Sequence, residues 1–138
     1  MLHDLLPTRG RISRIMNSND PTCKLCHNEP EYLPHLFDCS FSRDVCQALL
    51  HVVRSVCPRA DCHNILLLSL DLDKSRQFAT VWFISTILSY VWNSRSMKKI
   101  STLIETRAIL EARINILRKS RHFSNDVLLI EEYMINFI

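Results

Sequence analysis

The sequence predicts a mainly α-helical protein, and three observations support this fold class. A single glycine among 138 residues leaves few positions for the tight turns of β-hairpins, which need residues with positive φ. Apolar residues make up 47% of the chain, which argues against wholesale disorder, and they recur at helical spacings. We expect one compact domain, with a small metal-stabilised N-terminal module over residues 1–62 and a bundle of three to four helices over residues 63–138 packed on it.

The first expected element is a short helix that begins at Thr8, as its N-cap, and runs to about Met16. The segment Asn17–Pro21 ends this helix, because it is rich in turn-forming residues. The stretch Met1–Arg14 is polar and carries three arginines, so it does not indicate a signal peptide.

Four potential metal ligands come next, in the pattern C-x2-C-x8-H-x3-C: Cys23, Cys26, His35 and Cys39. The first two share a tight turn, and the last two are four residues apart, so they project from the same side of a helical turn. Three thiolates and an imidazole suit a tetrahedral structural zinc site, and they leave no position for a catalytic water. The pattern therefore predicts a closed Zn²⁺ site whose binding energy also stabilises the N-terminal module.

Two alternatives to this site stay open at the level of sequence. The cysteines and the histidine can be ordinary buried side chains, because a free cysteine packs as a small hydrophobe. His27 can also replace His35 as the fourth ligand, although its place directly after Cys26 makes the geometry awkward.

The residues around the ligands resemble a known family. The chain runs L-x-T-R-x-R-I, then D-x-x-C-x-x-C, then E-x-x-x-H-L-x-x-C-x-x-S-R, which is similar to the zinc-binding domain found next to the reverse transcriptase of non-LTR retrotransposons. The matching segments are Leu6–Ile12, Asp20–Cys26, Glu31 and His35–Arg43. Two later segments, Val81–Ile84 and Val91–Arg95, are similar more loosely to the tryptophan-rich helix and W-x-x-R ending of that family. Beyond about residue 100 no such pattern is present.

This resemblance implies a non-catalytic zinc module that belongs to a larger reverse-transcriptase polyprotein and assists binding of template RNA or target DNA. The chain has no Tyr-x-Asp-Asp motif and no set of carboxylates for two-metal phosphoryl transfer, so we expect no enzyme activity. Because Met1 lies only a few residues before the family pattern, the chain has the character of a detached tail of an element-encoded protein. Thiols committed to zinc imply a reducing, intracellular compartment, nuclear or cytoplasmic.

Two segments follow the metal ligands. A helix is expected from Ser40, as its N-cap, to Val56, and Cys57-Pro58 ends it. The apolar run Asn64–Leu70 is compatible with a strand or with a buried helical turn, and its periodicity does not decide between them.

The most apolar expected helix is Lys74–Asn93. Its apolar residues form one stripe that contains Phe78 and Trp82 and a second stripe that contains Phe83, Ile84 and Ile87. Hydroxyl side chains interrupt the segment, so its apolar stretch is shorter than the ~20 residues that span a bilayer. We therefore expect a central core helix and no membrane segment.

Two further helical segments complete the expected bundle. In Ile100–Arg118 the predicted buried face consists of Leu103, Ile104, Ala108, Ala112 and Leu117. The C-terminal segment Val127–Ile138 is apolar, and it is expected either to pack as a last helix or to dock on a partner.

Basic residues are distributed unevenly. Between Arg95 and His122 there are eight Lys or Arg residues but only two Glu residues, and such a cluster can neutralise phosphates. The simpler interpretation is a solvated helix end, where cations interact with the last carbonyls and the helix dipole. The candidate nucleic-acid-binding residues are Arg9, Arg11, Arg14, Lys98, Lys99, Arg118, Lys119 and Arg121.

The remaining constellations give weaker signals. Cys57, Cys62 and His63, with Cys46 as a possible fourth ligand, resemble half of a second metal site, but free thiols are the simpler interpretation. Asp71 and Asp73 precede a helix, where carboxylates act as caps. The sequence thus leaves two hypotheses, a zinc module that assists nucleic-acid binding and an architectural or protein-interaction module without nucleic acid.

Overall fold

The computed structural model describes residues 20–137 and confirms the mainly helical fold. The described residues form five α-helices and two short 3₁₀ helices, and their only β-type pairing is an isolated bridge between Thr22 and Pro30. The elements are η1 (Leu33–Phe37), α3 (Arg43–Val56), α4 (Cys62–Leu67), α5 (Lys74–Ser96), α6 (Leu103–Arg118), η2 (Arg121–Phe123) and α7 (Ser124–Asn136). The expected helix from Thr8 to Met16 lies outside the described residues.

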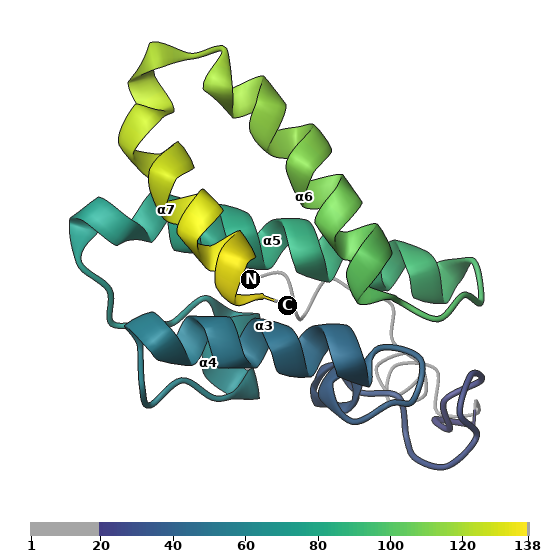
Figure 1. The fold of residues 1–138 in the computed structure, drawn as a ribbon. Coiled ribbons are helices and arrows are strands. Elements are labelled where there is room, and N and C mark those ends of the chain that lie inside the picture. The colour runs from purple at the N-terminus through teal and green to yellow at the C-terminus, as the bar shows by residue number, and fades with distance from the viewer. Residues whose placement is uncertain (1–19, 138) are drawn as a thin grey trace.

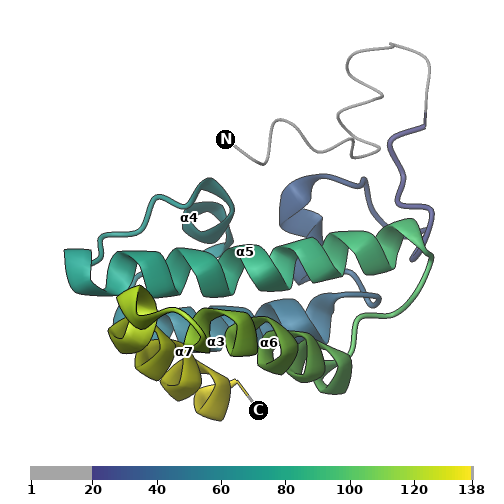
Figure 2. The ribbon, with the colours of Figure 1, turned by 90° about the horizontal axis from the view of Figure 1, so that it is seen from above.

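Helix α5 is the central element of the molecule. It packs against α3, α6 and α7, while η1 packs on α3 and α4. Figure 1 shows α5 crossing the molecule behind α6 and α7, with α3 below. In Figure 2, α4 and the segment that holds η1 lie on the opposite side of α5 from α3, α6 and α7.

One hydrophobic core joins these elements. Buried residues from η1 and α3, such as Phe37 and Leu49, belong to the same cluster as buried residues from α5, α6 and α7, such as Ile87 and Ile130. Residues on both sides of position 62 therefore contribute to a single core.

Helix α5 is longer than expected, and it turns the second of its two apolar stripes inward. Phe83, Ile84 and Ile87 are buried, as the second predicted stripe requires, but Phe78 on the first stripe is 41% exposed. Thr80 is also buried on the core side of α5. Its hydroxyl group lies 2.9 Å from the hydroxyl of Tyr133 on α7, so the two polar groups form a hydrogen bond with each other. Within residues 20–137 no helix combines the length and the hydropathy needed to cross a membrane.

The predicted buried face of α6 is wrong for three of its five residues. Leu103 and Leu117 are partly buried against the core, but Ile104, Ala108 and Ala112 are exposed, and the fully buried residues are Thr106, Leu110 and Ile114. Helix α6 begins at Leu103 and not at Ile100 as expected. Thr102 is its N-cap, and the Thr102 side chain accepts a hydrogen bond from the backbone N–H of Glu105. The segment has two apolar stripes, and its neighbours α3, α5 and α7 cover the stripe that contains Leu110.

The start of α3 also differs from the prediction. Ser40 does not cap this helix, because the chain continues through turns after Cys39 and α3 begins at Arg43. Ser42 occupies the N-cap position, but its hydroxyl group donates to the backbone carbonyl of Leu36 at 2.7 Å and so fixes η1 against α3.

The two ambiguous segments are both helical. The first four residues of the run Asn64–Leu70 belong to α4, which Asp61 and Asn64 open as a reciprocal capping box. The helix ends at Leu67, and its C-cap Leu68 has a φ of 54°, in the left-handed region. At the C-terminus α7 packs on α5, with Tyr133 and Phe137 buried edge-on against Phe83.

Candidate metal centre

The first half of the candidate site is a small hairpin. The backbone N–H of Cys23 donates to the carbonyl of Glu29 at 2.8 Å, and the N–H of Glu31 donates to the carbonyl of Pro21 at 2.8 Å. These bonds close a tight turn that carries Cys23 and Cys26. His27 completes the turn with a φ of 57°, a conformation that costs energy for a residue with a Cβ.

The second half of the site is the end of η1. Pro34 starts this helix in its first turn, and the N–H of Cys39 donates to the carbonyl of His35 at 2.8 Å. This four-residue hydrogen bond places His35 and Cys39 on the same side of the turn, as their spacing predicts. The hairpin and η1 therefore present two ligands each.

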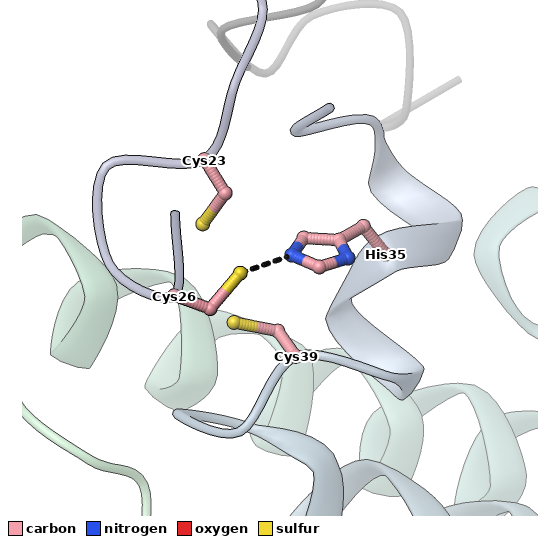
Figure 3. A group of neighbouring side chains, drawn as sticks. All are labelled: Cys23, Cys26, His35 and Cys39. Carbon is pink, nitrogen blue, oxygen red and sulfur yellow. Dashed lines mark hydrogen bonds between the residues drawn. The ribbon is translucent and has the colours of Figure 1, made fainter. Parts of the chain in front are cut away.

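The four predicted ligands converge. The ligand atoms of Cys23, Cys26, His35 and Cys39, here called the Cys₃His cluster, all lie within 4.8 Å of one another and can hold a metal ion. Figure 3 shows the three sulfur atoms and the imidazole directed toward one another, with Nε2 of His35 3.2 Å from Sγ of Cys26. A tetrahedral zinc ion with bonds of about 2.3 Å to sulfur separates its sulfur ligands by about 3.8 Å. The chemistry and the spacing of the cluster therefore fit such an ion.

His35, and not His27, supplies the imidazole of the cluster. His35 is buried, and its second ring nitrogen, Nδ1, lies 3.5 Å from a carboxylate oxygen of Glu29. A carboxylate near the free nitrogen of a metal-binding histidine favours the tautomer that leaves Nε2 available for the metal. His27 is exposed and does not belong to the group.

Two thiols of the cluster differ in how readily they take the thiolate form that metal binding needs. Burial opposes ionisation of Cys26, but hydrogen bonds from the backbone of Asn28 and from His35 outweigh it and lower its pKa from 9.0 to about 7. Burial raises the pKa of Cys39 despite the nearby guanidinium of Arg95. A bound cation would provide the compensation that Cys39 needs to ionise.

Arg95, from the end of α5, is the functional residue that sequence reasoning missed. Its Nη2 atom donates to Sγ of Cys23 at 3.2 Å and to a carboxylate oxygen of Glu31 at 2.7 Å. Its side chain is 4% exposed. Burial opposes its charge, yet hydrogen bonds to Cys39 and Glu31 hold the pKa of Arg95 above its ordinary value. Arg95 is therefore not part of an exposed basic surface, although it is one of the eight basic residues between Arg95 and His122.

The signal for this contact was present in the sequence but was not interpretable alone. Glu31 and Arg95 both belong to the segments that resemble the zinc-binding family, and they are 64 residues apart. Nothing in a local pattern pairs two such charges. The structure adds that Glu31 also lies 3.7 Å from Sγ of Cys23.

The other candidate phosphate-binding residues do not form one patch. Lys98 and Lys99 are exposed at the start of the α5–α6 connection, while Lys119 and Arg121 are exposed beyond the far end of α6. The 16 residues of α6 separate the two groups by about 24 Å at 1.5 Å per residue. Arg118 already pairs with Glu131 of α7. Arg9, Arg11 and Arg14 lie outside the described residues.

No second metal site is present among residues 20–137. Cys57, Cys62 and His63 do not gather into a group of ligands. Cys46 is fully buried, and burial raises its pKa to about 12. Asp73 occupies the N-cap position of α5, but its side chain makes no capping hydrogen bond.

Comparison of the chain with protein-family models, with curated proteins and with solved structures finds no match in any of the three.

Proposed function

We propose that this chain is a structural zinc-binding module without catalytic activity of its own. The observation that carries the proposal is the convergence of three thiols and one imidazole to within 4.8 Å, a donor set typical of structural zinc. All four coordination positions are filled by protein, so no position remains for a substrate or a reactive water.

The surroundings of the Cys₃His cluster support the same role. Zinc with three thiolates carries one net negative charge, and the guanidinium of Arg95 supplies a positive charge beside Cys23. Because Arg95 belongs to α5, the metal would connect the hairpin to the central helix of the core. In this arrangement the ion acts as part of the fold.

Metal content is the direct test of this proposal. Native mass spectrometry of the parent chain should find one zinc ion, and Cys39→Ser should lose it. Cys62→Ser is the matched control, because Cys62 is a partly buried cysteine outside the cluster and its loss should leave the zinc content unchanged. A parent chain that retains no zinc after purification in zinc-supplemented buffer would overturn the proposal.

We further propose that the module assists nucleic-acid binding as part of a retroelement reverse-transcriptase protein. This step is supported by the similarity of the residues that flank the ligands and by the three arginines at positions 9, 11 and 14. If these arginines contact phosphates, binding to duplex DNA or structured RNA weakens with salt, and each Arg→Gln change reduces the salt slope by about one. Binding without a salt slope, or no stronger than binding to an uncharged polymer, would refute this role.

The second candidate function is an architectural or protein-interaction module. One observation favours it specifically, namely the exposed apolar face of α6, where Ile104 is 83% exposed. Under this hypothesis the zinc-loaded chain associates with protein and is indifferent to nucleic acid. The two candidates therefore differ in a binding experiment with the same protein sample.

A further inference from the structure

The outer face of α6 carries an apolar ridge that nothing in the described part of the chain covers. Ile104, Ala108, Ala112 and Ile116 follow one another at intervals of four residues, and all four are exposed. Ile104 and Ile116, at the ends of the ridge, are 83% and 68% exposed. Figure 1 shows α6 at the margin of the molecule, with its neighbours on one side only.

The surface beside the ridge is hollowed. A groove of about 570 Å³ runs between α5 and α6, and its lining includes Ala108, Ile109, Ala112 and the exposed side chain of Met97. Two small alanines in the middle of a helix face allow another helix to approach closely, while larger residues at the ends increase the apolar area that is covered.

The ridge is symmetric about its own centre. Read in either direction, its four residues are isoleucine, alanine, alanine and isoleucine. An interface with twofold symmetry requires a surface that is complementary to itself. We propose that α6 mediates dimerisation of this chain through antiparallel pairing with α6 of a second copy, centred at residue 110.

The charges that flank the ridge support an antiparallel arrangement. In an antiparallel pair centred at residue 110, Arg113 of one copy lies opposite residue 107 of the other, two residues or about 3 Å along the helix from Glu105. Glu111 of one copy lies opposite residue 109 of the other, two residues from Arg107. This second pair of charges is on the opposite side of the ridge from the first. The antiparallel dimer therefore brings opposite charges to nearby levels on both sides of the ridge.

Existing contacts of these charged groups do not prevent the pairing. Arg107 and Glu111 form an exposed ion pair within α6 at 3.0 Å. Glu105 accepts a hydrogen bond from the Tyr90 hydroxyl and lies 3.7 Å from Nζ of Lys99. All four flanking residues remain exposed. Each can therefore take a second partner across the interface at little cost in desolvation.

The test is the oligomeric state of the full chain, measured by sedimentation velocity and light scattering over a hundredfold range of concentration. The parent should form a dimer whose dissociation constant rises at least tenfold in Ile104→Glu and in Ile116→Glu. Ile135→Glu and Leu128→Glu are matched controls, because these residues are similarly exposed on α7 and should leave the dimer intact. A parent that stays monomeric over the whole range, or a dimer that the α6 variants do not weaken, would overturn the proposal.

A second pair of variants tests the antiparallel register. Residue 108 of one copy faces residue 112 of the other, so Ala108→Glu with Ala112→Glu places like charges together and should abolish the dimer. Ala108→Lys with Ala112→Glu places opposite charges together and should restore it. Both variants lose the same two alanines at exposed positions. Equal loss of dimer in both would refute the register and with it the proposal.

Discussion

Replacement of Arg95 by methionine should destabilise the protein strongly, because it removes a buried charge that joins α5 to the metal hairpin. The guanidinium bonds to Cys23 at 3.2 Å and to Glu31 at 2.7 Å, and hydrogen bonds to charged groups each contribute about 1.5–3 kcal/mol. Removing one partner of a buried ion pair costs about 3–5 kcal/mol. Glu31 is partly accessible, with 13% of its side chain exposed, so we expect a loss near the lower limit, about 3 kcal/mol.

This loss is measurable as a shift in thermal stability. With an unfolding entropy of about 2.1 cal/mol/K per residue, a loss of about 3 kcal/mol over a chain of 138 residues lowers Tm by about 10 °C. Circular dichroism at the helical band of zinc-loaded protein gives the measurement. Arg59→Met is the control, since Arg59 is exposed in the connection between α3 and α4 and should change Tm little.

The metal-free protein provides the decisive comparison. Without the ion the sulfur of Cys23 is no longer part of a negatively charged zinc–thiolate group, so the bond from Arg95 to this sulfur weakens while the bond to Glu31 remains. The cost of Arg95→Met should therefore fall to about half in the presence of a chelator. A Tm for zinc-loaded Arg95→Met within about 2 °C of the parent would refute the reasoning, because the loss would then be below about 1 kcal/mol.

Three further predictions concern protonation and packing. The pKa of Cys26 is about 7 in the folded state, below its unfolded value of 9.0. The metal-free protein should therefore gain stability as pH rises from 7 to 9 and lose that stability as pH falls through 7. Urea midpoints at a series of pH values measure this pH dependence, and Cys26→Ser should flatten it. Tyr133→Phe removes the buried hydrogen bond to Thr80 and should cost about 1–2 kcal/mol in urea unfolding, whereas no change would mean that the Thr80 hydroxyl finds another partner. Leu110 is 1% exposed, so Leu110→Ala should lower the free energy of unfolding by about 2–5 kcal/mol. Ile104→Ala should lower it by less than about 0.5 kcal/mol. Equal losses would contradict the burial of Leu110 and the exposure of Ile104 on α6.

The part of the site that could be predicted from sequence is the part that is local. Spacing alone placed Cys23 and Cys26 on one turn and His35 and Cys39 on one side of another, since the geometry of a turn depends on neighbouring residues. The choice between His27 and His35 needed the folded hairpin, because only the structure shows that His27 is exposed and outside the group of ligand atoms.

Long-range packing limited the rest of the prediction. The segment of α6 has one apolar stripe through Leu110 and another through Ala108, and periodicity cannot say which one the neighbouring helices cover. Arg95 was counted with the surface charges because it lies near Lys98 and Lys99 in the sequence. Its burial depends on Cys23, which is 72 residues away.

The connection between Arg95 and Glu31 also bears on the order in which the protein folds. Closing the loop of 8 residues between Cys23 and Glu31 costs about 2 kcal/mol of chain entropy, whereas closing the 64 residues between Glu31 and Arg95 costs about 4 kcal/mol. The hairpin can therefore form early, before Arg95 of α5 docks on it. Docking of Arg95 then becomes a late step, and its Arg95→Met variant should accelerate unfolding more than it slows folding.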